Sequence, residues 1–162
     1  MLQKIRAYCQ ICAVEINGFG IVERRGNDLL ITDAFITRQV AKDESVVADG
    51  EGILRACAER GIKADQLRCQ WHSHVNAPAV FSEQDIRQIN TWSGGYMVSI
   101  VANKRGDARC RIDCYEPLRL AIEVPLELAF ETTESLLRAC RSEVSEQVII
   151  MRTQKKNGGR HD

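Results

Sequence analysis

Residues 71–85 read WHSHVNAPAVFSEQD and hold two of the chain's three histidines, His72 and His74. Side chains alternate between the two faces of an extended strand, so histidines two residues apart point the same way. Both imidazoles can then reach a single metal ion. The stretch therefore predicts a strand that ends in a chelating pair.

The second half of the same stretch supplies a carboxylate. Pro78 lies in the connecting loop, and Ser82 opens a helical pattern in which Ser82 and Asp85 share one face. A His, His, Asp set leaves the fourth tetrahedral position of zinc open for water, as in catalytic zinc sites. We predict that His72, His74 and Asp85 bind one catalytic zinc ion.

Each half of the stretch also has a plainer interpretation. Two histidines on a strand can form a half-exposed polar face without binding a metal. A serine followed three residues later by an acidic residue is also a capping box, in which Ser82 and Asp85 serve only the helix start. The combination favours the metal site, because His-x-His, seven residues and Ser-x-x-Asp follow one another at a strand end and a helix start.

This spacing resembles the JAMM (MPN+) zinc metalloprotease family, or JAB domain, whose signature adds a distant glutamate before a glycine in a short apolar strand. Residues 15–20, which begin with Glu15, are the one segment that fits. The resemblance extends over roughly residues 4–103. One difference is visible, because Val75 stands where the family commonly has proline after the second histidine, but it removes no ligand.

The resemblance implies a role for each residue. Zinc held by His72, His74 and Asp85 would lower the pKa of a water molecule from about 15.7 towards roughly 7. Glu15 would act as general base and then deliver the proton to the departing amine. The Ser82 hydroxyl would stabilise the oxyanion. Without the resemblance, a glutamate at position 15 would be interpreted as an exposed strand-end residue.

The resemblance also implies a substrate class. Members of this family typically cleave peptide or isopeptide bonds after the Gly-Gly tail of ubiquitin or a ubiquitin-like protein. The chain is similar to stand-alone bacterial members that accompany E1-like and E2-like proteins, so we expect a ubiquitin-like protein, its conjugates and such pathway proteins as partners. Two alternatives stay open: a non-catalytic MPN-type scaffold, and a metallopeptidase with an unrelated substrate. A zinc deaminase is disfavoured because its His-x-Glu and Pro-Cys-x-x-Cys signature is missing.

The amino-acid composition bears on possible binding partners and on the cellular location. Lysine plus arginine and aspartate plus glutamate are balanced at 22 each, so the net charge gives no reason to expect nucleic-acid or membrane binding. No long apolar run indicates a signal peptide or a membrane span. An odd number of scattered cysteines, seven, favours reduced thiols and a cytoplasmic location. We expect a monomer or a homodimer.

The cysteine spacing leaves one minor alternative. Cys9-x-x-Cys12 and Cys110-x-x-x-Cys114 could together form a second, structural zinc site. Cys9 and Cys12 share a helical face, however, and Cys110 and Cys114 share a strand face, which is also how small buried cysteines are placed in a core. We therefore predict core positions for these four thiols.

A length of 162 residues is typical of a single domain, here residues 1–152, followed by a flexible tail at 153–162. The hydrophobic periodicity predicts an α/β fold of mixed α+β type, and the resemblance implies an MPN/JAB-like, cytidine-deaminase-like central sheet flanked by helices. The expected elements are a helix at 2–14, strands at 15–23 and 28–36, no regular element at 38–49, a helix ending before Gly61, a strand at 67–74, a helix at 82–92, a central strand at 96–102, strands at 109–115 and 118–124, and a long helix at 127–152.

Overall fold

The computed structural model describes residues 2–42, 45–48, 50–63, 65–127 and 133–151. Its helices are α1 (Leu2–Ile11), α2 (Gly50–Arg60), α3 (Glu83–Ile89) and α4 (Glu134–Gln147). Its strands are β1 (Asn17–Arg25), β2 (Asp28–Phe35), β3 (Gln39–Lys42), β4 (Ser45–Ala48), β5 (Leu67–Ser73), β6 (Tyr96–Ala102), β7 (Ala108–Cys114), β8 (Leu120–Val124) and β9 (Val148–Ile150). No helix within these ranges is long and apolar enough to cross a membrane.

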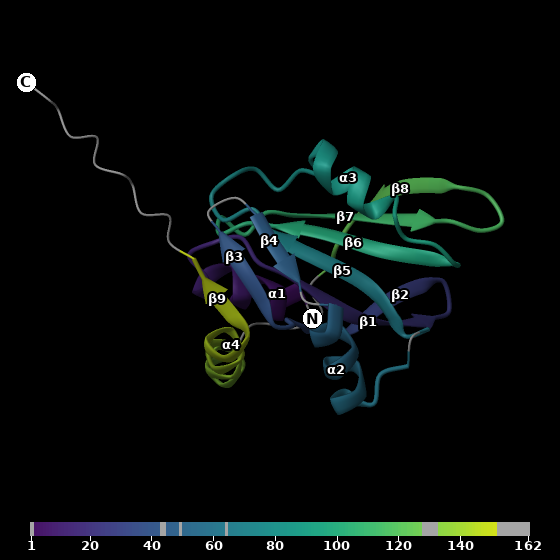
Figure 1. The fold of residues 1–162 in the computed structure, drawn as a ribbon. Helices are drawn as coiled ribbons and strands as arrows, with labels where there is room; N and C mark the ends of the chain where they lie inside the picture. Colours follow the sequence, from purple (N-terminus) through teal and green to yellow (C-terminus); the bar gives the residue numbers. More distant parts are fainter. Residues whose placement is uncertain (1, 43–44, 49, 64, 128–132, 152–162) are drawn as a thin grey trace, which may run out of the picture.

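Two sheets organise the chain. The larger has the strand order β2-β1-β5-β6-β7-β8, and β5 and β6 run parallel while the other neighbours run antiparallel. The smaller has the order β4-β3-β9. Helix α3 lies over one side of the large sheet (Figure 1). Helix α1 packs on the other side, where its Tyr8 contacts Trp71 of β5. One face of β5 is therefore turned towards α1, and the opposite face is turned towards α3.

The core lies between α1 and the large sheet. Tyr8 of α1 stacks on Trp71 of β5, with ring centroids 5.4 Å apart and planes 4° from parallel. Both side chains are almost fully buried. Gly18 of β1 allows this packing, because a Cβ atom there would overlap the carbonyl oxygen of Phe35 and lie 2.6 Å from the Trp71 ring. The indole therefore holds β1 and β5 at a close and fixed distance.

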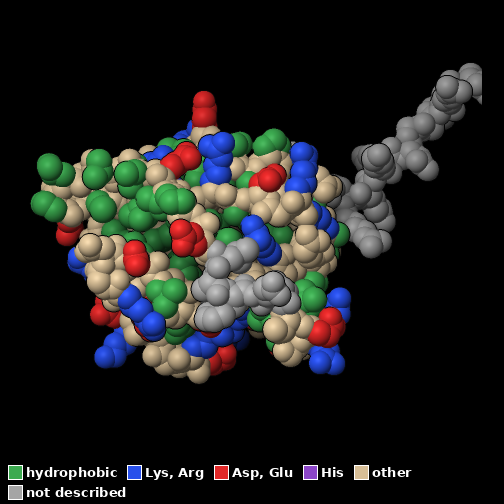
Figure 2. Space-filling model, turned by 180° about the vertical axis from the view of Figure 1, so that it is seen from behind, with side chains coloured by type: hydrophobic (Ala, Val, Ile, Leu, Met, Phe, Trp, Pro, Cys, Tyr) green, Lys and Arg blue, Asp and Glu red, His purple; other side chains and the backbone are tan. Residues whose placement is uncertain are grey.

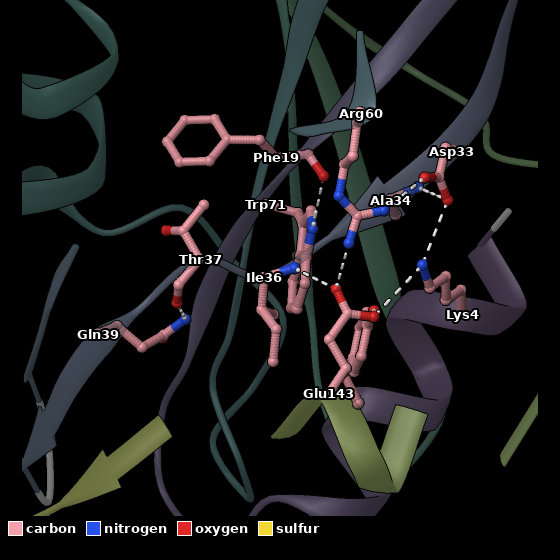
Figure 3. A network of polar contacts seen from close by, with 11 residues as sticks. Lys4, Phe19, Asp33, Ala34, Ile36, Thr37, Gln39, Arg60, Trp71 and Glu143 are labelled. Carbon is pink, nitrogen blue, oxygen red and sulfur yellow. Dashed lines mark hydrogen bonds and ion pairs between the residues drawn. The ribbon is translucent and has the colours of Figure 1, made fainter. Parts of the chain in front are cut away.

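Helix α4 is attached to this core by one acidic side chain. Glu143 lies 3.5 Å from the Lys4 ammonium and 3.0 Å from the Arg60 guanidinium, and it accepts a hydrogen bond from the Tyr8 hydroxyl. The Ile36 amide donates to the same carboxyl group at 3.3 Å. Figure 3 shows Lys4, Ile36 and Arg60 around Glu143, each from a separate part of the chain. The contacts join α4 to α1, α2 and the chain that follows β2.

The mixed α and β architecture expected from the sequence is confirmed. The β1–β2 hairpin turns at Gly26, which has a φ of 63°, and the predicted strand at 96–102 coincides with β6. The expectation of no element at 38–49 was wrong, because β3 and β4 lie there. Gln39 explains part of this error: it is a polar side chain that is only 1% exposed, and it bonds the backbone of Asn17 at 3.0 and 2.9 Å.

The long helix predicted at 127–152 was also wrong in extent. Helix α4 ends at Gln147, and Val148 begins β9, which pairs in parallel with β3. Two β-branched isoleucines follow Val148, and such residues favour a strand when an edge is available to pair with. Residues 128–132 and the predicted tail at 153–162 lie outside the described residues.

Candidate metal centre

β5 presents both predicted histidine ligands from one face. Cys69, Trp71 and Ser73 are buried against the core, while His72 and His74 are partly exposed on the opposite face. This is the alternation that the sequence predicted. Because β5 is paired on both edges, by β1 and by β6, the direction of the two imidazoles is set by the sheet.

Glu15 is brought to the histidines by strand register. In the antiparallel pairing of β1 with β5, Asn17 lies opposite His72, and the residues next along are joined by a backbone hydrogen bond of 2.8 Å. Continuing the register by one more step sets Glu15 opposite His74. Glu15 is half-buried and lines the same cleft as both histidines. The separation of 57 positions between Glu15 and His72 is thus closed by a single strand pair.

Asp85 is positioned by the start of α3. Ser82 is the N-cap residue, its hydroxyl oxygen accepts from the Asp85 amide at 3.2 Å, and the Asp85 carboxylate accepts from the Ser82 amide at 2.7 Å. The capping box considered for the sequence is therefore present. It does not compete with the metal interpretation, because the same bonds hold the Asp85 carboxylate facing the histidines.

The three predicted ligands converge within a few ångströms. The Nε2 atoms of His72 and His74 are 3.0 Å apart, and the carboxylate oxygens of Asp85 lie 3.3 Å from His72 Nε2 and 3.7 Å from His74 Nε2. Ligand bonds of 2.0–2.2 Å at tetrahedral angles separate neighbouring ligand atoms by roughly 3.4 Å. The three observed separations lie close to this value, so the donor set fits zinc. Among the described residues, this is the one cluster of its kind that could hold a metal ion.

A backbone contact orients one of the ligands. The Nδ1 atom of His74 lies 2.9 Å from the carbonyl oxygen of Pro78, which can only accept a hydrogen bond. The ring proton therefore belongs on Nδ1, and the lone pair belongs on Nε2, which faces His72 and Asp85. Partners of this kind fix the tautomer of metal-binding histidines and are typical of metal sites.

The charges around the cluster favour an ionised Asp85. Burial alone would raise the pKa of its carboxyl group, but the contacts with His72, His74 and Ser82 hold the pKa below its usual range. The pKa of His74 is raised, mainly by Asp85, and the negative charge of Glu15 acts in the same direction. An anionic carboxylate is the form that binds a metal.

A cleft of about 490 Å³ opens over the cluster. Glu15, Ser82 and Phe81 form parts of its wall, and the Phe81 ring lies against His72 with centroids 6.4 Å apart. Ser82 therefore has two contacts with the site: its amide bonds Asp85, and its side chain lines the cleft. All five residues predicted from the sequence border this one cavity.

A model of one protein family, described as prokaryotic homologues of the JAB domain, matches residues 5–113. The chain belongs to this family. No curated protein matches the chain. The family match contains Glu15 and the whole of residues 71–85, so the resemblance inferred from the spacing is confirmed.

The JAB-domain match ends within β7, before β8 and α4. The elements that carry the candidate site lie inside it: β1, β5 and α3. Helix α4 lies outside it but contributes Glu143 to the core, so the folded unit extends beyond the matched segment. The family often has metal-dependent peptidase activity, and the metal-binding geometry of this chain is consistent with it.

The one visible departure from the family pattern has a structural counterpart. Val75 has a φ of 38°, in the left-handed region. Proline is restricted to a φ of about −65° and could not take this conformation. The loop after His74 therefore follows a backbone path that the common proline would forbid, although the carbonyl oxygen of Pro78 still reaches the His74 ring.

The polar floor of the cleft was not predicted from the sequence. The Gln70 amide donates to the Ser99 hydroxyl at 3.0 Å and accepts from the Trp92 indole at 2.9 Å. Gln70 was placed on the histidine face by strand alternation, and that was the available signal. Ser99 gave none, because it lies inside the apolar run of β6 and pairs with β5 only in the fold.

The second zinc site considered for the cysteines is not supported. All seven cysteines are free, and Cys9, Cys12 and Cys110 are buried in the core. Within the described ranges, no cluster of metal-binding side chains includes any of them. Cys9, Cys12 and Cys110 are small apolar residues of the core, as predicted, whereas Cys114 is only partly buried.

Proposed function

We propose that this JAB-domain chain is a zinc-dependent peptidase or isopeptidase that cleaves after the Gly-Gly tail of a ubiquitin-like protein. One observation carries the catalytic part of the proposal. A half-buried acidic residue, Glu15, lies just before β1 and lines the cleft that also holds three convergent ligand atoms, and Asp85 and the charge of Glu15 both raise the pKa of His74. A scaffold has no need for an acid at that position.

The residues divide the work of hydrolysis. A zinc ion held by His72, His74 and Asp85 would supply Lewis acidity and a water molecule of lowered pKa. The Glu15 carboxylate accepts a proton as the water oxygen bonds to the carbonyl carbon, and it returns that proton to the amine nitrogen as the C–N bond breaks. Such a shuttle typically contributes about 10²–10⁴-fold in rate.

Ser82 can assist at the carbonyl oxygen. Its hydroxyl oxygen already accepts the Asp85 amide, so its own proton remains available to donate into the cleft. A donor of this kind stabilises the negative charge that develops on the oxygen and is typically worth about 10²–10³-fold in rate. The capping bond also restricts the rotation of the hydroxyl, which reduces the ordering needed in the transition state.

The cleft wall suits a peptide main chain. The described lining includes uncharged amide side chains, Asn76, Gln84 and Gln88, that can bond peptide N–H and C=O groups, and it includes no lysine or arginine. An anionic substrate such as a phosphate would find no cationic side chain there. Glycine residues can approach the aromatic wall at Phe81 most closely because they have no side chain.

The free cysteines support a cytoplasmic location for the proposed peptidase. All seven thiols are free in the fold, which suits a reducing compartment. We include E1-like and E2-like proteins of a ubiquitin-like conjugation pathway among the proposed partners, on the strength of the family resemblance. A metallopeptidase with another substrate is the alternative that the experiment must separate.

The proposal is tested with a ubiquitin-like protein joined through its Gly-Gly tail to a reporter. Wild type should release the reporter, whereas Glu15→Gln and His72→Ala should be inactive. Glu23→Gln, at an exposed glutamate of the following strand β1, is the matched control and should retain activity. Turnover retained in both site variants would contradict the mechanism. Equal cleavage of an Ala-Ala fusion would instead contradict the proposed specificity.

A further inference from the structure

One edge of the large sheet is apolar and uncovered. β8 pairs with β7, and no other strand in the described residues pairs with it. Leu118, Leu120 and Ile122 are 77%, 63% and 54% exposed. Figure 2 shows hydrophobic side chains gathered at the upper left, the end of the molecule where β8 lies. Monomeric proteins usually protect such an edge with charges or a bulge, because its free backbone groups invite another strand.

The sequence of this edge is symmetric about its centre. Residues 117–125 read PLRLAIEVP, with Ala121 in the middle; β8 is Leu120–Val124, and residues 117–119 directly precede it. Moving outward, Leu120 is matched by Ile122, and Arg119 is matched by Glu123. The next matched positions are both apolar, and the outermost are both proline. In an antiparallel pair related by a two-fold axis, positions matched in this way lie opposite each other.

We propose that two copies of this chain associate through β8, with the two-fold axis at Ala121. Leu120 then lies opposite Ile122 of the partner subunit on one face of the sheet. On the other face, Arg119 lies opposite Glu123 of the partner subunit. The symmetry repeats each pair, so the central segment from Arg119 to Glu123 makes two apolar contacts and two opposite-charge contacts. The symmetry of residues 117–125 therefore favours a second copy of this chain as the strand that pairs with β8.

Charge and proline both select this register. A shift of the partner by one residue would move its apolar side chains to the polar face. A shift by two would separate Arg119 from Glu123 of the partner subunit. Proline lacks a backbone N–H, so Pro117 and Pro125 end the pairing at both limits of the symmetric segment. The proposed contact is therefore short, bounded and self-complementary.

The pairing leaves the candidate metal centre accessible. Glu123 pairs with Arg111 of β7, which pairs with Ser99 of the cleft floor, so Glu123 lies on the cleft face of the sheet. Because opposite residues of a paired strand point to the same side, both copies present their clefts on one side of a continuous sheet. The inference does not depend on the proposed function, since β8 contributes no residue to the cleft lining.

Charge reversal tests the pairing in solution. Sedimentation velocity of the full chain over a concentration series should show a monomer–dimer equilibrium. Arg119→Glu and Glu123→Arg each create two like-charge contacts and should raise the dissociation constant by roughly tenfold or more. An equimolar mixture of the two variants should restore the dimer, because both pairs across the interface then join opposite charges, although Glu123→Arg also removes the ion pair of Glu123 with Arg109 of its own chain. The control Arg141→Glu, at an exposed ion pair on α4, should leave association unchanged.

Cross-linking tests the position of the axis. Cα atoms of directly opposite residues lie about 4.5–5.5 Å apart, within reach of a disulfide. Ala121→Cys, in a background with the partly exposed Cys57 and Cys114 changed to serine, should therefore form a disulfide dimer under mild oxidation. Glu123→Cys should not, because its own copy would lie four residues away along the partner strand, about 13 Å.

Three results would overturn the proposal. The first is a wild-type chain that stays monomeric up to millimolar concentration, as expected if another segment of the chain covers β8. The second is a dimer that neither charge reversal weakens, which would place the contact on another surface. The third is equal cross-linking of both cysteine variants, which would exclude the proposed register.

Discussion

The Tyr8 hydroxyl of α1 donates a hydrogen bond to Glu143 of α4, a helix that lies outside the family-matched segment. The Glu143 side chain is only 17% exposed and also faces Lys4 and Arg60 (Figure 3). Tyr8 in turn stacks on Trp71, the residue next to the first histidine ligand. This one hydrogen bond therefore connects the last helix to the strand that carries the candidate metal centre.

We expect Glu143→Ala to lower the free energy of unfolding by about 3 kcal/mol or more, because it leaves buried donors without an acceptor. Glu146→Ala, three residues along the same helix and exposed, should change it by less than about 0.5 kcal/mol. Urea denaturation followed by circular dichroism measures both. Equal effects of the two substitutions would show that Glu143 contributes no more than a surface carboxylate.

Alkaline pH should destabilise the fold. Burial raises the pKa of the Cys9 and Cys110 thiols from 9.0 to about 12, and burial followed by the bond to Glu143 raises the pKa of Tyr8 above its ordinary 10.0. The unfolded chain therefore loses these protons first as the pH rises above about 9. Each group should cost about 1.4 kcal/mol per pH unit between its unfolded and folded pKa.

The measurement is urea denaturation at pH 8 and pH 10.5 with a reductant present. Cys110→Ala removes one of the titrating groups, so the free energy of unfolding should fall less steeply with pH in that variant. If the Cys110 thiol were exposed, its pKa would be the same in the folded and unfolded chains, and removing it would not change how the free energy of unfolding depends on pH. A fall that is equally steep with and without the Cys110 thiol would exclude it as a contributor.

The candidate site was predictable because its pattern is local. His72 and His74 are two residues apart on a strand, and Asp85 is at a helix start with a capping serine, so strand alternation and capping rules predict their directions. Glu15 was predictable only through the family resemblance. Its approach to His74 depends on the register of β1 against β5, which is a long-range pairing that hydrophobic periodicity does not encode.

The errors in the fold have the same origin. β3 and β9 pair with each other across more than a hundred positions, and the β-branched residues of β9 form a strand only because the edge of β3 is there to pair with. Buried Gln39 is polar because it bonds the backbone of β1, so its burial could not be recognised before the neighbouring strand was known. Tertiary partners, rather than local propensity, decided these segments.

The zinc content of purified variants should distinguish the proposed metal ligands from the proposed general base, Glu15. His72→Ala and Asp85→Ala each remove one of three convergent ligand atoms and should lose zinc, whereas Glu15→Gln should retain it. Elemental analysis of the purified variants against wild type measures this directly. Circular dichroism must show that each variant is folded. Complete loss of zinc from Glu15→Gln would mean that Glu15 is a ligand and that its proposed role is misassigned.

Ser82 allows its two contributions to be measured separately. Ser82→Ala should cost about 1 kcal/mol of stability because the N-cap acceptor is lost, while glycine at an N-cap costs only a few tenths. Both substitutions remove the hydroxyl donor, so both should reduce kcat by about 10²–10³-fold. Ser82→Thr keeps the hydroxyl and should retain most activity. If Ser82→Gly keeps full kcat, the hydroxyl serves only the helix.

Val75 gives a prediction that runs against the family pattern. Although proline is common at this position in JAB domains, Val75 has a φ of 38°, so Val75→Pro should lower the free energy of unfolding by more than about 1 kcal/mol. Val75→Gly relieves the left-handed strain but adds freedom to the unfolded chain, so it should change stability by between zero and about 1 kcal/mol in the favourable direction. The loop also holds Pro78 against the His74 ring, so Val75→Pro should weaken zinc binding as well. Urea denaturation measures the change in stability, and titration with a competing chelator measures the change in zinc affinity. A Val75→Pro variant that is more stable and binds zinc more tightly than wild type would contradict the prediction, because the loop would then have the backbone conformation that proline allows.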